Sequence, residues 1–171
     1  MAMTAIEWKR YYAAERHRLG EGALAALLDG APPVGRWTAL VFPHTRLEAS
    51  GLLVAAAARA IVESGRDEVL ALGVLHRSRA GAVARSRGVH GHGLAGDAGL
   101  WRDEFSLDAL RALVELQARR CGRRAPLLIE RYPLLTGDDP ATLSGYAELR
   151  ALVDRGAAVV ATADLVHHGI G

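Results

Sequence analysis

Hydrophobic residues follow two alternating patterns along the chain. Four segments carry apolar residues at helical spacing: 4–29, 48–64, 106–120 and 141–155. Four shorter runs between them are apolar almost throughout: 37–43, 68–75, 126–135 and 157–163. Such short, continuous runs are typical of strands that are covered on both faces. Gly20 and Gly22 interrupt the first helical segment, and we expect the helix to break there.

The order of these elements predicts the fold class. After the first helix, strands and helices alternate, which predicts an α/β fold with three layers. In it, a mostly parallel sheet is flanked by helices on both faces, and the crossovers are right-handed. The 171 residues fit one domain, 1–171. The segment 77–101 is rich in glycine and has no period, and we expect it to be a functional or mobile loop.

Composition excludes several classes of protein. No apolar run approaches the roughly 20 residues that span a bilayer, so we expect no membrane partner. The beginning of the chain is polar and amphipathic, unlike a signal peptide, which predicts a cytoplasmic protein. Cys121 is the single cysteine, so no internal disulfide can form, and its place beside Gly122 predicts a packing role at a helix end.

The basic residues are nearly all arginines, although the net charge is only +2. Lys9 is the sole lysine among the 21 basic residues. Two clusters stand out: Arg77, Arg79, Arg85 and Arg87, and Arg119, Arg120, Arg123 and Arg124. Arginine suits phosphate recognition, so a phosphate- or nucleic-acid-binding module is one alternative function. We favour solvated faces for both clusters, and we expect no nucleic-acid partner.

Polar residues follow three of the four predicted strands. His44 follows the first strand, His76 ends the second, and Asp164, His167 and His168 follow the last. Ligands of open α/β sheets bind outside the carboxyl ends of the strands, and neutral imidazoles are common metal ligands. The histidines together predict a metal or catalytic cleft, although each alone is better explained as a helix cap or as a hydrogen bond to a loop carbonyl. We expect the remaining three histidines to face solvent: His17, His90 and His92.

Four segments resemble motifs of the Memo-like family, which is related to the class III extradiol dioxygenases. Residues 43–51, Pro-His-Thr-Arg-Leu-Glu-Ala-Ser-Gly, are similar to Pro-His-Ala-Gly-Tyr-x-Tyr-Ser-Gly. Residues 72–76, Leu-Gly-Val-Leu-His, are similar to Leu-Gly-Pro-x-His. Residues 104–108, Glu-Phe-Ser-Leu-Asp, resemble Glu-His-Ser-Leu-Glu, and residues 162–169, Thr-Ala-Asp-Leu-Val-His-His-Gly, resemble Ser-Ser-Asp-Leu-Ser-His-Tyr-Gly. The four segments occur in the family's order, over nearly the whole chain.

The resemblance implies a dioxygenase-type fold whose metal, in the dioxygenases, is Fe(II) held by two histidines and a carboxylate. His44 and His76 match the family's two metal-site histidines, and His167 matches the histidine near the third position. Phe105 stands where the dioxygenases carry an acid/base histidine, and Val166 stands where the third metal ligand belongs. A phenylalanine cannot transfer a proton, and a valine cannot bind a metal.

These departures predict a Memo-like protein whose cleft binds a small molecule or a metal with degenerate or absent dioxygenase activity. The expected cofactor is a divalent metal (Fe(II), Zn or Cu) or none. The alternative is an active ring-cleaving enzyme on a catechol-like substrate, in which His167 or His168 completes a three-histidine site and acts in catalysis. Asp164 is a weaker candidate for the third ligand, because in this motif we expect it to orient a histidine or to cap the strand end.

The chain ends soon after the last motif, whereas family members usually continue. We therefore expect the last strand to lie exposed at the sheet edge, where unpaired backbone groups are a liability. A homodimer or a covering N-terminal helix would protect it, and we expect a homo-oligomer.

Overall fold

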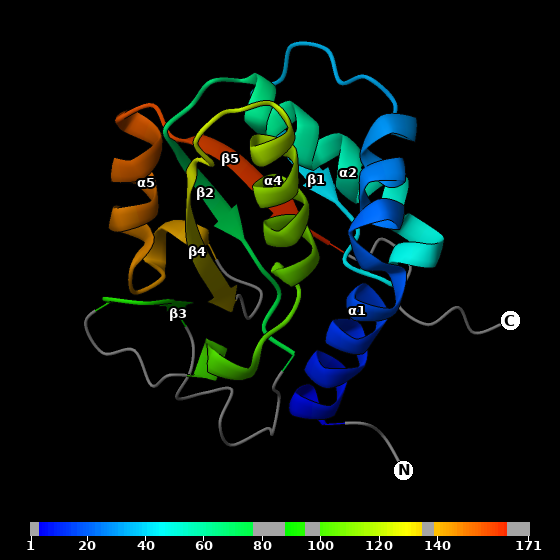
Figure 1. Cartoon of the computed structure of the whole chain (residues 1–171). Helices are drawn as coiled ribbons and strands as arrows, with labels where there is room; N and C mark the ends of the chain where they lie inside the picture. The colour runs from blue at the N-terminus through cyan, green and yellow to red at the C-terminus, as the bar shows by residue number, and fades with distance from the viewer. Residues whose placement is uncertain (1–3, 77–87, 95–99, 135–138, 164–171) are drawn as a thin grey trace, which may run out of the picture.

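The computed structural model describes residues 4–76, 88–94, 100–134 and 139–163. Their helices and strands follow the order α1 (Ala5–Gly30), β1 (Ala39–Phe42), α2 (Leu47–Glu63), β2 (Glu68–Leu72), β3 (Gly88–His90), η1 (Leu100–Asp103), α4 (Asp108–Arg120), β4 (Leu127–Leu134), η2 (Pro140–Thr142), α5 (Tyr146–Asp154) and β5 (Ala158–Thr162). This is the α/β class that the sequence predicts, and each expected helix and strand is present (Figure 1).

The sheet has the strand order β1-β5-β2-β4-β3. The first four strands are parallel, and only β3 runs antiparallel, against the end of β4. The expectation that the last strand lies at the edge is therefore wrong, because β5 pairs with both β1 and β2. Its charge-free sequence suits this central place. The homo-oligomer expected from an exposed last strand loses that support and stays a prediction.

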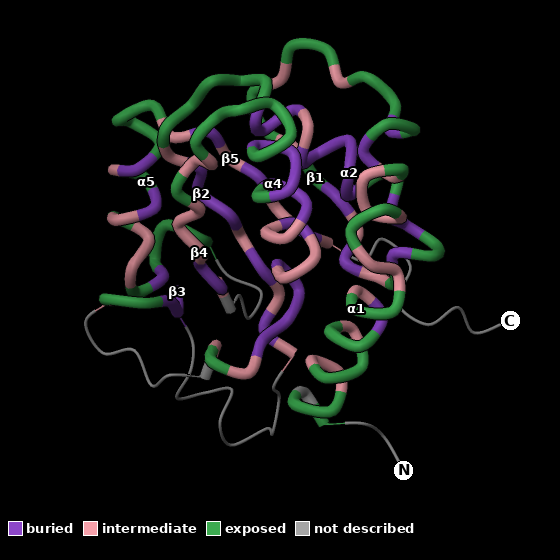
Figure 2. Tube along the Cα trace, in the orientation of Figure 1, coloured by how far each residue is buried: buried purple, intermediate pink, exposed green. Residues whose placement is uncertain are grey.

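Helices cover both faces of the sheet, which gives the three expected layers. Alternate residues of β2 show the two faces, since Val69 and Ala71 belong to the large core under α1, α2 and α4. Leu70 instead packs with Leu149 and Leu152 of α5 on the other face. The buried stretches of the tube in Figure 2 run through β2, α2 and α4 where they meet.

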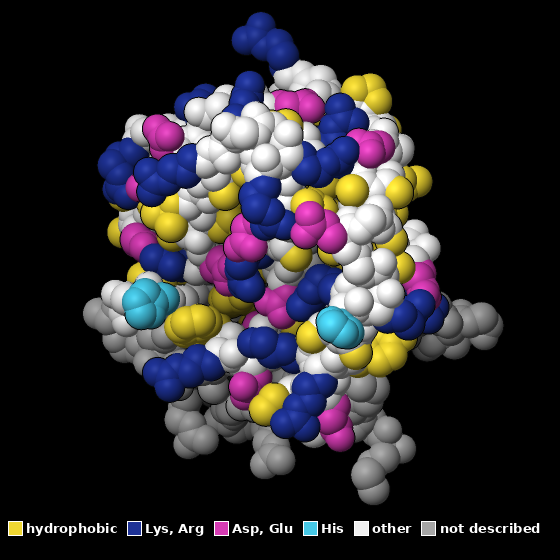
Figure 3. Space-filling model, viewed as in Figure 1, with side chains coloured by type: hydrophobic (Ala, Val, Ile, Leu, Met, Phe, Trp, Pro, Cys, Tyr) yellow, Lys and Arg dark blue, Asp and Glu magenta, His cyan; other side chains and the backbone are white. Residues whose placement is uncertain are grey.

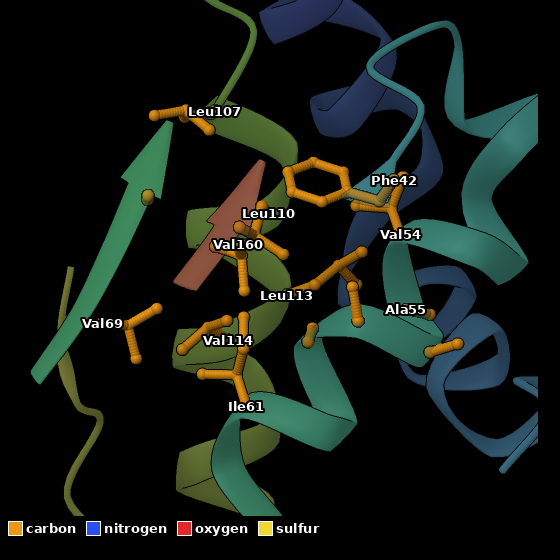
Figure 4. Packing of buried hydrophobic residues seen from close by; sticks show 14 of the residues in the cluster. Phe42, Val54, Ala55, Ile61, Val69, Leu107, Leu110, Leu113, Val114 and Val160 are labelled. Atoms are coloured by element: carbon orange, nitrogen blue, oxygen red, sulfur yellow. The ribbon is translucent and has the colours of Figure 1, made fainter. Parts of the chain in front are cut away.

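The large core is aliphatic and closely packed. Figure 4 shows side chains of α2, α4 and the neighbouring strands directed into one space. Val54, Ile61, Leu110, Leu113 and Val160 are all fully buried there. Interiors of this kind fix the backbone of the strands, so the residues at strand ends are held in defined positions.

The N-terminal helix is capped and kinked as local sequence dictates. Thr4 accepts the backbone N–H of Glu7, and the Glu7 side chain accepts that of Thr4, which forms a capping box. Gly20 has φ 69°, outside the helical region, so the predicted break is confirmed. No helix of the described segments is long and apolar enough to cross a membrane.

One short element, β3, lies within the predicted loop 77–101, and a second, η1, begins at its end. β3 adds three residues to the sheet, and η1 adds one 3₁₀ turn before α4. The last helix, predicted for residues 141–155, is shorter in the structure. The turn η2 and Gly145, whose φ of 86° is left-handed, precede α5.

Candidate site at the carboxyl edge of the sheet

His44 lies two residues beyond β1 and is almost fully buried, with 7% of its surface exposed. Thr162, the last residue of the neighbouring strand β5, pairs in register with Phe42. Its hydroxyl lies 2.9 Å from Nδ1 of His44. The backbone N–H of Ala163 also donates to the Phe42 carbonyl, at 3.0 Å. The end of β5 therefore fixes the orientation of the His44 ring.

His76 is held by a carboxylate that is far away along the chain. One carboxylate oxygen of Glu104 accepts the backbone N–H of His76 at 2.8 Å, and the other lies 2.7 Å from its Nδ1. The Glu104 side chain is completely buried. Next to it, the Ser106 hydroxyl accepts the Val74 N–H at 3.0 Å and donates to the Val74 carbonyl at 3.3 Å. Residues 104–106 thus hold the segment that follows β2.

The two imidazoles meet at the edge of the sheet. Their Nε2 atoms lie 3.1 Å apart, and the ring planes are inclined by 77°. The strands that lead to them, β1 and β2, flank β5, so three neighbouring strands end at this point. In Figure 1 the arrows of β2 and β4 run downward, so the carboxyl edge of the sheet is the lower one in this view. The structure therefore brings together His44 and His76, as their strand-end positions suggest.

A stack of aromatic rings covers one face of His76. Phe105 lies parallel to the imidazole, with centroids 4.5 Å apart and planes inclined by 17°. Tyr12 stacks on the other face of Phe105 at 5.0 Å, and Trp8 stacks on Tyr12 at 5.7 Å. Phe105 is 6% exposed, so it forms an apolar wall of the site. It offers no group that could give or take a proton.

The turn that carries His44 is held from α1. The buried carboxylate of Glu15 accepts the backbone N–H groups of Leu47 and Glu48, at 3.2 and 3.4 Å. These are first-turn amides of α2, whose own N-cap residue, Arg46, makes no side-chain cap. A carboxylate at a helix N-terminus is favoured by both the free amides and the helix dipole. Glu15 therefore replaces the missing cap.

Four of the residues that the sequence analysis singled out fall outside the described residues: His167, His168, Asp164 and Val166. His90 is buried at 6% exposure, so the expectation that it faces solvent is wrong; as part of β3 it pairs with Tyr132 of β4. Two other histidines are exposed as expected: His17 and His92.

Three of the four arginines of the second cluster contact other parts of the fold. Arg119 pairs with Glu21 at 3.3 Å, and Arg120 pairs with Asp29 at 2.6 Å. Arg123 donates to the Val62 carbonyl at 3.1 Å. The first cluster, within 77–87, lies outside the described residues. Cys121 lies at the end of α4 but is exposed, so the packing role expected for it is wrong.

Sequence reasoning singled out the histidines but missed the residues that hold them. Glu104 lies in one of the four segments that the sequence analysis singled out, yet its role emerges only from its contacts with His76. Thr162 was one residue of a strand-end motif, and Glu15 carried no signal beyond its place in a helix. A buried carboxylate or hydroxyl next to a histidine becomes visible only when the elements are packed.

No match identifies a family for the chain. Its sequence matches neither a family model nor a curated protein, and no solved structure matches it. Within the described segments, no group of three or more histidine, cysteine or carboxylate side chains is placed to hold a metal ion. The site is therefore defined by its own geometry: two histidines, a buried carboxylate, a hydroxyl and an apolar wall.

Proposed function

We propose that the chain binds a divalent transition-metal ion at the carboxyl edge of its sheet, with Nε2 of His44 and of His76 as ligands. The separation of 3.1 Å between these two atoms carries the proposal. Two nitrogens that each lie about 2.1 Å from one ion, at an angle of about 90–110°, are separated by roughly 3.0–3.4 Å.

The hydrogen-bond partners of the two Nδ1 atoms support this assignment. Glu104 accepts a hydrogen bond from Nδ1 of His76. The Nε2 atom of the neutral ring then carries no proton, and its lone pair is available to a metal ion. Metal-binding histidines generally donate their other N–H to a carboxylate, carbonyl or hydroxyl in this way. If His44 donates to Thr162 in the same manner, the two lone pairs face each other and require a cation between them.

A shared proton is the competing explanation of the pair. The Thr162 hydroxyl can also donate to His44 Nδ1, because it rotates freely. His44 would then carry its proton on Nε2 and donate it to His76 across the same 3.1 Å. Metal binding decides between the two arrangements.

The site as described supplies two ligands, and we propose that His167 supplies the third. β5 leads the chain to Ala163 beside the pair, where the Ala163 N–H bonds to the end of β1. His167 follows four residues later. The open positions of the ion would take a small, metal-chelating molecule.

The pair should bind Co(II), a visible stand-in for Fe(II) or Zn, with one ion per chain. His44→Ala and His76→Ala should each weaken binding about tenfold or more, since each removes one ligand. Titration monitored by visible absorption and calorimetry measures this. His17→Ala, at an exposed histidine of α1, is the matched control. Equal binding by the wild-type protein and His44→Ala would rule out this site, and the histidines would then form the hydrogen-bonded pair.

We further propose that the site binds its ligand without cleaving an aromatic ring. Phe105 packs flat against His76, so the group nearest the imidazole face cannot act as acid or base. Within the described segments, the buried carboxylate of Glu104 is occupied by two N–H groups of His76. An active extradiol-type dioxygenase remains the alternative, in which His167 or His168 would transfer the proton.

With Fe(II) added anaerobically, the protein should perturb the absorption of a bound catechol. Admission of air should then give no ring-cleavage product at rates above those of Fe(II) alone. The measurement is the yellow absorption of a ring-opened semialdehyde or acid. Product formation that depends on His44 would instead establish the active dioxygenase, and failure of catechol to bind would exclude catechols as the ligand.

A further inference from the structure

A cavity lies at the amino edge of the sheet, at the end opposite to the histidine pair. It has a volume of about 690 Å³. The loop before β1, the end of α2 and the end of α5 line this cavity, which is open to solvent, and its apolar wall consists of Val34, Trp37, Ala60 and Val153. Binding pockets for small molecules have volumes of about 300–1,000 Å³ and are mainly apolar with a few polar groups.

The polar groups of this cavity are cationic. Arg36 and Arg66 both line it. Arg66 donates one N–H to the Gly156 carbonyl at 3.0 Å, and neither guanidinium forms an ion pair within the described residues. Most other arginines of the described chain face a carboxylate, as Arg111 faces Glu130. Two guanidiniums without an ion pair among the described residues therefore line one cavity.

The carboxylate that lines the cavity and the one at the end of α5 are already neutralised. Glu63, the carboxylate that lines the cavity, pairs with Arg59 at 3.3 Å. Asp154, at the end of α5, pairs with Arg150 at 3.0 Å. The upper part of Figure 3, which is the amino edge in this view, carries many Lys and Arg side chains. The net charge of the side chains that line the cavity is positive.

Trp37 adds a flat apolar surface next to the charge. Its ring is partly buried against the large core, which fixes it, and its neighbour in the chain is Arg36. A guanidinium recognises phosphate, sulfonate or carboxylate through paired N–H donors. A planar apolar body would pack against the indole and Val153.

We infer that this cavity binds a small organic anion, whose charged group contacts Arg36 and Arg66 and whose flat apolar part lies against Trp37. The cavity is open to solvent, and its volume matches a single small molecule, whereas a nucleic acid follows an extended row of positive charges. This inference does not depend on the metal site at the other edge.

Phenyl phosphate is a suitable probe, because it joins an anion to an aromatic ring. The three tryptophans give three indole N–H signals in a ¹H–¹⁵N NMR spectrum, and Trp37→Phe assigns one of them. Phenyl phosphate should shift the Trp37 signal saturably and leave those of Trp8 and Trp101 in place. Arg36→Ala should raise the dissociation constant about tenfold, which corresponds to about 1.4 kcal/mol.

Arg10→Ala, at an exposed arginine of α1, is the matched control and should bind like the wild-type protein. Arg66→Gln should weaken binding too, and its melting temperature reports whether the loop at Gly156 is intact. Inorganic phosphate should bind more weakly than phenyl phosphate. An unshifted Trp37 signal, unchanged affinity in Arg36→Ala, or a shift produced only by a single-stranded oligonucleotide would each overturn the inference.

Discussion

Replacement of Glu104 by alanine should weaken Co(II) binding by about 10–100-fold and cost on the order of 2–4 kcal/mol of unfolding free energy. The carboxylate is completely buried and accepts both N–H groups that His76 presents to it. Alanine would leave these two donors without their acceptor and open a small void beside them. The imidazole would lose its fixed tautomer and its orientation at the same time. Chemical denaturation and metal titration measure the two effects separately.

Glu104→Gln separates the two effects of that change. The amide keeps the volume and one acceptor oxygen, but it turns an NH₂ group toward an N–H donor of His76. We expect a smaller loss of stability than with alanine and still a clear loss of metal affinity. Glu115→Ala, at an exposed carboxylate of α4, should change neither quantity. Wild-type metal affinity in Glu104→Ala would show that this carboxylate does not position His76 for a metal.

The alternation of strands and helices could be read from the sequence because each element carries its own pattern. β2 and β5 are short and almost wholly apolar, and the buried residues of β2 alternate between two helical layers. α2 and α4 carry a wide apolar face that packs into the core. Local composition specifies elements of this kind.

The order of the strands and the shortest strand could not be read in the same way. β3 has three residues, Gly-Val-His, and exists because its backbone pairs with β4, so no hydrophobic run marks it. The place of β5 follows from α5, which crosses back over the face opposite to α2 and α4. The absence of charge in β5 was the one local hint of a central strand.

One part of the candidate site could likewise be predicted from the sequence, and another part could not. Strand-end positions pointed to His44 and His76, because parallel strands bring their carboxyl ends to one edge. The residues that orient them are 28 positions away for His76 and 118 for His44, and only packing brings them close. The cavity around Trp37 and Arg36 is likewise formed by elements from three parts of the chain.

Gly73 should not tolerate even the smallest side chain, and Gly73→Ala should cost roughly 1–3 kcal/mol of unfolding free energy or more. A Cβ at this position would lie 2.3 Å from Cε1 of the Tyr132 ring and 2.9 Å from the Ser106 hydroxyl. Neither can move easily, since Tyr132 is 2% exposed and Ser106 bonds to Val74. The clash rather than the backbone conformation makes glycine necessary here. At about 2–4 °C per kcal/mol, the melting temperature should fall by several degrees.

Two comparisons test this cause of the Gly73 effect. Gly35→Ala should be nearly neutral, because a Cβ there meets nothing within 4 Å. The double variant Gly73→Ala/Tyr132→Leu should be more stable than the sum of the single changes predicts, because the shorter side chain gives up the space that the new methyl needs. The loop from Gly73 to His76 is held by Ser106 and Glu104, so a displaced Gly73 should also weaken metal binding. Strict additivity of the two changes would mean that the Tyr132 ring is not what excludes a side chain at Gly73.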